Sequence, residues 1–249
     1  MSLPRFFVDQ PSEAFQIGQP FTLPPKAAHH AGRALRLATG ERVEVFNGSG
    51  RAWNGPIGFS PDATWVDIKA FSDRTAEPPV FMTLVQAMVS PEKTEWIVEK
   101  AVECGISRIV LTPAERSVTR LSGDRLSKRV ARLIDIARSA AEQCGRNVVP
   151  EIVAAPSFAA ALEQIEAELK LILAPGAEPG IPEKLRPGLS SAAFAVGPEG
   201  GFTTAEIELA FSKTWVPTLL GPRVLRTETA GLAAACWIET LAGDYPRAI

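Results

Sequence analysis

From residue 80 onward, the chain alternates between short apolar runs and longer segments in which apolar residues recur every three or four positions. The runs Val80–Val89 and Arg108–Thr112 predict buried strands, and Arg125–Cys144 predicts a helix with one apolar face. The same pattern predicts further strands at Glu151–Ala154, Lys170–Ala174, Ala192–Val196 and Val216–Leu220. This alternation is typical of an α/β domain with a mostly parallel sheet and helices on both faces.

The first part of the chain has a different pattern. Four short strands are predicted at Arg5–Val8, Arg42–Phe46, Ala52–Phe59 and Thr64–Phe71, with one helix at Pro25–Leu37. Several short strands with little helix predict a small β-barrel. Consecutive prolines continue neither kind of element, so we expect a β-barrel domain over residues 1–72, a linker at 73–79 and an α/β domain over 80–249.

Polar residues mark where the helices of the second domain begin. Ser90, Ser157 and Thr227 each precede a helical pattern and are expected N-caps, with a proline following Ser90. Thr203 and Glu206 have the spacing of a capping box.

Two glycine-rich loops follow two of the predicted strands near the C-terminus. Gly197-Pro198-Glu199-Gly200-Gly201 ends one strand, and Gly221-Pro222 ends the next. In an open α/β sheet such strand ends form ligand sites. Neither loop matches a dinucleotide fingerprint or a P-loop, and neither carries a lysine, so the expected ligand has an adenine-like edge and little phosphate. The alternative is that the glycines only permit tight turns.

Composition and charge bear on three further properties: nucleic-acid binding, metal binding and cellular location. A net charge of −2 gives no global nucleic-acid signal, yet residues 108–146 hold nine Lys and Arg against four Asp and Glu. This local excess is either a solvated helix face or a polyanion contact. Three isolated cysteines and two adjacent histidines predict no metal site. Without a signal-peptide pattern or a membrane span, we expect a cytoplasmic protein.

Several motifs together resemble one family. The glycine loop at 197–201 and the segment Leu220–Ala230 resemble the paired C-terminal motifs of the RsmE family, SPOUT-class methyltransferases that act on N3 of a uridine in 16S ribosomal RNA. Pro4–Phe7, the Glu99–Gly105 segment and the Ala141–Arg146 segment are similar to other blocks of that family. Cys104 stands where the family usually has leucine, and of the family's pattern at the first α/β helix only Lys93 carries over.

The resemblance implies a PUA-like β-barrel, then a methyltransferase domain whose C-terminal part threads a trefoil knot. It implies S-adenosyl-L-methionine as cofactor, a homodimer with the active site at the subunit interface, and 16S ribosomal RNA, in an assembled small subunit, as partner. It implies no membrane and no metal.

The resemblance also implies roles for individual residues. Arg226 would be the cation that stabilises the uridine anion, and Glu199 or Glu228 would take the N3 proton. For Glu228 the alternative is a charge partner of a helix N-terminus. The residues expected to bind the cofactor are Leu173, Ala174, Gly197, Gly200, Gly201, Leu219, Leu220, Gly221, Val224, Leu225 and Arg226. The residues expected to bind RNA are Arg5, His30, Arg33, Arg36, Arg116, Arg125, Arg129, Gln143 and Arg146.

Two other functions remain open at this level. A ribose 2′-O-methyltransferase of the same superfamily would usually carry an asparagine-rich motif where this chain has Leu225–Ala230. A non-catalytic RNA-binding adaptor built on the β-barrel would bind no cofactor.

Overall fold

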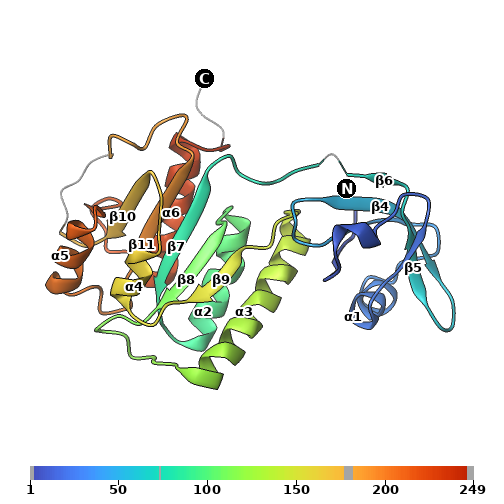
Figure 1. The fold of residues 1–249 in the computed structure, drawn as a ribbon, viewed down its shortest axis with the longest axis horizontal. Coiled ribbons are helices and arrows are strands. Elements are labelled where there is room, and N and C mark those ends of the chain that lie inside the picture. Colours follow the sequence, from blue (N-terminus) through green and yellow to red (C-terminus); the bar gives the residue numbers. More distant parts are fainter. Residues whose placement is uncertain (1–2, 73, 177–181, 246–249) are drawn as a thin grey trace. The chain divides into compact units, whose positions relative to one another are not determined.

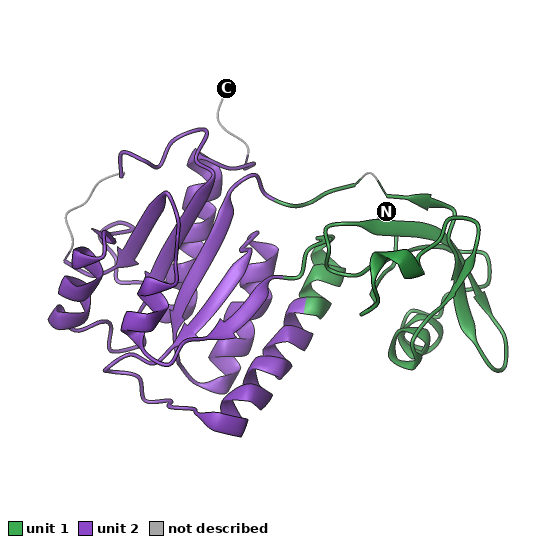
Figure 2. Ribbon diagram, viewed as in Figure 1, with its two compact units in different colours: residues 1–77, 138–149 green, residues 78–137, 150–249 purple. Residues whose placement is uncertain are grey.

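The computed structural model describes residues 3–72, 74–176 and 182–245. The chain forms two compact units, which Figure 2 shows in different colours. Unit 1 comprises residues 1–77 and 138–149, and unit 2 comprises residues 78–137 and 150–249. Residues 138–149 therefore group with the first unit, although the division expected from the sequence places them in the α/β domain over residues 80–249.

Unit 1 is built on a six-stranded sheet. Its strands are β1 (Arg5–Phe7), β2 (Pro20–Thr22), β3 (Arg42–Phe46), β4 (Ala52–Phe59), β5 (Thr64–Asp67) and β6 (Ala70–Phe71). The order is β1-β3-β4-β5-β2, and β6 pairs with β4. The first pair, β1 with β3, is parallel, whereas the other pairs are antiparallel. The strand predicted over Thr64–Phe71 is thus two strands, and β2 was not predicted.

Short helical turns connect the strands of unit 1. The α1 helix (Pro25–His29) continues directly into η2 (His30–Ala34), a π-helical turn, and η1 (Ser12–Ala14) is a single 3-10 turn. The helix predicted over Pro25–Leu37 therefore changes its hydrogen bonding halfway, and Arg36 follows it with a φ of 53°. The sheet and these turns enclose an apolar core that includes Phe6, Val43, Trp53, Ile57 and Val66.

Unit 2 contains a parallel six-stranded sheet (Figure 1). Its strands are β7 (Phe81–Ala87), β8 (Arg108–Thr112), β9 (Glu151–Ala154), β10 (Leu169–Leu173), β11 (Ser191–Val196) and β12 (Val216–Thr218). Their order is β12-β10-β11-β7-β8-β9, and every pairing is parallel. This confirms the predicted α/β class with a mostly parallel sheet. Since the strands are parallel, the loops that follow β10, β11 and β12 leave the same edge of the sheet.

Helices pack on the sheet of unit 2, as Figure 1 shows. They are α2 (Pro91–Glu103), α4 (Phe158–Glu163), α5 (Thr204–Ser212), α6 (Thr227–Leu241) and the part of α3 (Gly123–Cys144) that precedes residue 138. The α6 helix packs against α2, β7 and β11, while α4 packs against α5, β7 and β8. The buried core between α4, α5 and the sheet includes Phe158, Phe202 and Trp215.

Three of the four predicted helix caps, Ser90, Ser157 and Thr203, occupy the N-cap position, and Thr227 does not. Thr203 and Glu206 form the capping box with both reciprocal hydrogen bonds, and the Ser157 side chain accepts from the Ala160 N–H. The Ser90 side chain makes no capping hydrogen bond. Thr227 is the first helical residue rather than the cap, and Arg226 occupies the cap position without a side-chain hydrogen bond. The Thr227 hydroxyl has other partners, described below.

Candidate active site

A cavity of about 630 Å³ opens where β10, β11 and β12 end. Its walls come from three loops: residues 173–176, 196–201 and 218–226, with the start of α6 closing one side. Strand order explains this arrangement, because β10 lies between β11 and β12 and all three run in the same direction. A cavity of this size matches a small-molecule or cofactor site.

The cavity brings together most of the side chains and glycines expected at a cofactor site. Its lining includes every residue of the expected cofactor set except Gly221. Arg226, Glu199 and Glu228, the expected catalytic residues, also line it. The walls combine apolar side chains such as Leu173, Val196 and Leu225 with a small charged group.

That charged group is centred on Lys93, in the first turn of α2. Its Nζ lies 2.8 Å from Glu199 Oε1 and 3.9 Å from Glu228 Oε2. One lysine therefore faces two carboxylates, one from the first glycine loop and one from the first turn of α6. This pairing neutralises Lys93 and leaves Arg223 and Arg226 as the other cationic side chains of the lining.

The ion pair shifts the titration of both its members. The hydrogen bond from Glu199 raises the pKa of Lys93 above its ordinary value. The hydrogen bond from Lys93 in turn lowers the pKa of Glu199. Glu199 is thus held as a carboxylate. By contrast, Glu228 Oε2 is buried and accepts no hydrogen bond from the part of the chain that the structure describes.

The first glycine loop turns back tightly on itself. A Cβ atom on Gly197 would lie 3.0 Å from the Phe202 backbone nitrogen and 3.1 Å from the Gly201 carbonyl carbon. Gly201 has a φ of +67°, in the region that favours glycine. The loop needs these glycines for its shape, which agrees with the tight-turn interpretation as well as with a ligand site.

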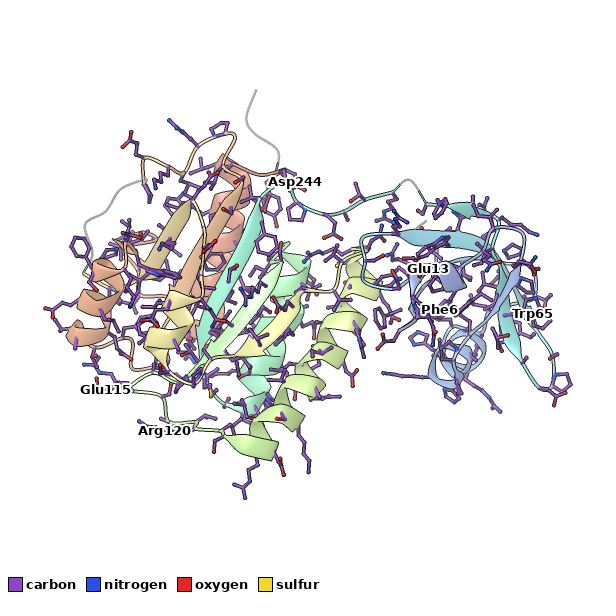
Figure 3. All side chains as sticks on the ribbon, in the orientation of Figure 1. Phe6, Glu13, Trp65, Glu115, Arg120 and Asp244 are labelled. Atoms are coloured by element: carbon purple, nitrogen blue, oxygen red, sulfur yellow. The ribbon has the colours of Figure 1, made fainter. Side chains whose placement is uncertain are left out.

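The loop between β8 and α3 packs against the first glycine loop and forms hydrogen bonds with it. The guanidinium of Arg116 donates to the Gly200 carbonyl at 2.8 Å, and a Cβ on Gly200 would lie 3.2 Å from the Arg116 Cβ. Glu115 accepts from the Thr203 hydroxyl, and its backbone N–H donates to Glu206. Figure 3 labels Glu115 and Arg120 on this loop, and Arg120 donates to the Glu115 carbonyl. Arg116, expected to bind RNA, is therefore placed directly beside the cavity loop.

The two other expected RNA-binding residues of unit 2 lie at the start of α3. Arg125 is exposed, whereas Arg129 forms an ion pair with Glu95 of α2 at 2.6 Å. The side chain of Arg132, one turn further along, is exposed by 62% and reaches the same glutamate. The predicted basic face is present, but Glu95 neutralises part of it.

The expected RNA-binding residues of unit 1 fall into two groups. His30, Arg33, Arg36 and Gln143 are exposed. Arg5 and Arg146 are buried, with exposures of 8% and 2%. Arg5 pairs with Glu44 and donates to the Arg146 carbonyl and to Asn147 Oδ1.

The buried arginines belong to one network. Arg146 donates from Nε to Glu77 Oε2 at 2.9 Å, while Glu77 Oε1 accepts from the backbone N–H groups of Asn147 and Val148. Burial lowers the pKa of Arg5 to about 10, so it remains charged at neutral pH. Both guanidinium groups are thus directed into the unit, which their sequence context did not indicate.

Sequence reasoning missed several residues of the cavity. Lys93 carries over from the family pattern without an assigned role, and Thr218 was not predicted. Arg223 and Thr227 are polar residues beside the glycine loops to which the sequence assigned no site role. Lys93 could not be placed because it is 106 residues from Glu199 in sequence. Over residues 3–72, 74–176 and 182–245 there is no cluster of three potential metal ligands. No helix in these ranges is long and apolar enough to cross a membrane.

Comparison with known proteins gives concordant matches. Residues 76–239 match a family model described as an RNA methyltransferase domain, and residues 23–57 match an RNA methyltransferase PUA domain. Ribosomal RNA small subunit methyltransferase E of Bacillus subtilis is 29% identical, and the match covers 96% of this chain and 99% of that protein.

Two solved structures are similar over nearly the whole chain. A ribosomal RNA small subunit methyltransferase E from Neisseria gonorrhoeae, bound to S-adenosyl methionine, is 32% identical with a TM-score of 0.87. A putative methyltransferase from Legionella pneumophila, in complex with the bound cofactor SAM, is 30% identical with a TM-score of 0.89. Each match covers 98% of this chain and 100% of the other.

Proposed function

This chain belongs to the RNA methyltransferase family, and from that premise we propose that it methylates N3 of a uridine in 16S ribosomal RNA with S-adenosyl-L-methionine as methyl donor. The observation that carries the proposal is the cavity at the ends of β10, β11 and β12, which joins apolar walls to Lys93, Glu199, Arg226 and Glu228. The RsmE resemblance and the similar structures bound to S-adenosyl methionine support it.

The residues of the cavity fit that cofactor. Backbone groups of the three loops would meet an adenine edge, while Leu173, Val196 and Leu225 would cover its faces. Lys93 is already paired with Glu199, so among the described residues the cavity offers no free lysine for a polyphosphate. When bound, S-adenosyl-L-methionine supplies an electrophilic methyl group carried on a sulfonium sulfur.

The chain's own residues would prepare the nucleophile. N3 of uridine is protonated at neutral pH and must lose its proton before it can form a bond to the methyl carbon. Arg226 is exposed at the cavity and would stabilise the negative charge that develops on the uracil ring.

Of the two candidate bases, we favour Glu228. Glu199 is held by Lys93 at 2.8 Å, and its lowered pKa makes it a weak proton acceptor. Glu228 has a buried oxygen that accepts no hydrogen bond within the described ranges and lies 3.9 Å from Lys93. Glu199 and Lys93 would then orient Glu228. Its position in the first turn of α6 also suits a carboxylate that only complements the helix dipole.

For RNA binding we propose the exposed members of the expected set. His30, Arg33, Arg36 and Gln143 would contribute from unit 1, and Arg116 and Arg125 from unit 2. Arg129 is left out because its side chain is only 14% exposed and is paired with Glu95. Arg5 and Arg146 are instead assigned to the interior of unit 1, because their guanidinium groups are buried and paired. We further propose the domain division at residues 72 and 80, the trefoil knot, a homodimer, a cytoplasmic location and a small ribosomal subunit as substrate, all of which the family resemblance supports.

The proposal is tested by titration calorimetry followed by methyl transfer. The protein is expected to bind S-adenosyl-L-methionine and to transfer its methyl group to small subunits lacking the modification. Mass mapping of the RNA should place the methyl group on the base of a uridine. A ribose methyl group would contradict the N3 assignment, and failure to bind the cofactor would favour an RNA-binding adaptor.

Arg226→Ala and Glu228→Gln separate the proposed roles. We expect Arg226→Ala to abolish turnover while changing cofactor affinity by only a few fold. Glu228→Gln should lower kcat by about 10²–10⁴-fold, whereas Glu199→Gln should lower it much less. Equal losses for the two glutamates would refute the choice of base.

A further inference from the structure

A buried chain of hydrogen bonds runs from β7 to the start of α6, where the second glycine loop ends, and from there to the first glycine loop. The Gln86 side chain, fully buried on β7, donates from Nε2 to the Thr227 hydroxyl at 3.1 Å. The Thr227 hydroxyl, which is 6% exposed by residue, donates in turn to the Gly197 carbonyl at 2.6 Å. We call this chain the Gln86–Thr227–Gly197 relay.

The relay has a defined direction. Gln86 Nε2 also donates to the Ala87 carbonyl at 3.1 Å, and a carbonyl oxygen can only accept. A flipped amide would place two acceptors together, so Nε2 must be the atom that faces Thr227. The hydroxyl oxygen of Thr227 therefore accepts from Gln86, and its proton is left for Gly197.

Local packing brings the relay together. Thr227 and Gly231 lie one turn apart on the same face of α6. A Cβ atom on Gly231 would lie only 3.3 Å from Leu84 Cδ1 and 3.6 Å from Val196 Cγ2, so glycine permits a close approach of α6 to β7 and β11. This approach places the Thr227 hydroxyl on Gly197, where the first glycine loop begins.

We propose that Gln86 and Thr227 are positioning residues that fix the spacing of the two glycine loops and thereby prepare the cavity for its cofactor. Thr227 ends the second glycine loop and lines the cavity, and its buried hydroxyl donates its one proton to the Gly197 carbonyl. The hydroxyl therefore acts on a bound molecule through Gly197 and the loop that follows it. This inference rests on the proposed function for the identity of the ligand.

The main test is cofactor binding by three variants of α6. Thr227→Val keeps the side-chain shape without the hydroxyl, Thr227→Ser keeps the hydroxyl, and Thr229→Val makes the same change at an exposed position outside the cavity. Titration of the full chain with S-adenosyl-L-methionine should give a Kd about 10-fold or more weaker for Thr227→Val. The Kd should stay within about 3-fold of wild type for the other two variants.

Kinetics distinguish positioning from general loss of structure. In Thr227→Val the KM for the cofactor should rise in step with its Kd, and saturating cofactor should restore kcat to within about 3-fold of wild type. Gln86→Met, which removes the donor to Thr227, should have the same effect in smaller measure. Wild-type affinity in Thr227→Val, or equal losses for valine and serine, would overturn the proposal.

Amide hydrogen exchange of the ligand-free protein tests the relay independently of cofactor binding. The amides of residues 197–201 and 221–226 should exchange faster in Thr227→Val than in Thr227→Ser. Unchanged exchange in the valine variant would refute the relay. If the wild-type protein bound no S-adenosyl-L-methionine, the proposed function would fail, while the exchange measurement would still decide whether the relay fixes the loops.

Discussion

Glu77 accepts hydrogen bonds from both side-chain and backbone groups of the buried arginine network of unit 1. Its Oε2 accepts from Arg146 Nε at 2.9 Å, and its Oε1 accepts from the N–H groups of Asn147 at 2.8 Å and Val148 at 2.9 Å. Glu77→Ala removes both acceptor oxygens and all three hydrogen bonds at once. We expect this substitution to destabilise the protein strongly, although Glu77 lies outside the cavity.

The loss in free energy of unfolding can be estimated from the groups that Glu77→Ala would leave without an acceptor, namely the Arg146 guanidinium and two backbone N–H groups. Arg146 is 2% exposed, and removing one partner of a buried ion pair costs about 3–5 kcal/mol. Each buried N–H that loses its acceptor costs about 1–3 kcal/mol, but the Glu77 side chain is 22% exposed, so water would replace part of the loss. We therefore expect about 3–4 kcal/mol in total for Glu77→Ala. Glu77→Gln keeps an acceptor for the backbone N–H groups but loses the charge paired with Arg146, so it should cost about 2–3 kcal/mol, less than Glu77→Ala.

Urea denaturation followed by tryptophan fluorescence measures these differences. The matched control is Asp9→Ala, which removes an exposed ion pair with Arg138 in the same unit. Asp9 has a 79% exposed side chain, so the control should cost less than about 1 kcal/mol. If Glu77→Ala were as mild as Asp9→Ala, the network would not stabilise unit 1, and Arg146 would return to the set of candidate RNA contacts.

Three further predictions follow from particular contacts. Gly197→Ala should weaken S-adenosyl-L-methionine binding by about 10-fold or more, because its Cβ would meet loop backbone at 3.0 Å. A Kd within about 3-fold of wild type, measured by titration calorimetry, would contradict this prediction. Burial and the nearby Cys236 thiol raise the pKa of Cys104 to about 12, so iodoacetamide at pH 8 should modify it at least about 100-fold more slowly than free cysteine, as peptide mass spectrometry would show; a rate near that of free cysteine would refute its burial. Burial raises the pKa of Glu142, which accepts from the Phe7 N–H, so the folded state keeps this proton to a higher pH than the unfolded state does and loses stability as pH rises through the folded pKa. Urea unfolding should therefore show Glu142→Gln gaining stability relative to wild type between pH 4 and pH 7, and an opposite trend would sink the argument.

Local sequence signals predicted local structure well. The capping box at Thr203 and Glu206 lies within four consecutive residues, and both its hydrogen bonds form. The alternation of strand and helix likewise predicted the parallel sheet of unit 2. These features depend on residues close in sequence, so a pattern can report them.

The errors arose where a side chain has a distant partner. Threonine is a common N-cap residue, but the Thr227 hydroxyl forms hydrogen bonds with Gly197, 30 residues away, and Gln86, 141 residues away. Arg5 and Arg146 read as exposed cations, since nothing near them in sequence indicates that they would be buried together. The strand order, in which β11 returns beside β7, is also set by packing between distant segments. The π-helical turn at His30 left no signal that we recognised.

Unit 1 consists of two segments of the chain, so the ribosome does not synthesise it in one continuous stretch. Its last segment, residues 138–149, supplies Arg146 and Asn147 to the network around Arg5, yet the ribosome adds it about 70 residues after Glu77. At roughly 5–20 residues per second, the first unit waits several seconds during synthesis for its closing segment. Only residues 78–137 of unit 2 are translated in that interval, so unit 1 has its closing segment while residues 150–249 of unit 2 are still to be made. A nascent chain halted before residue 138 should expose the strands of unit 1 to chaperones and proteases, and one extended past residue 149 should not.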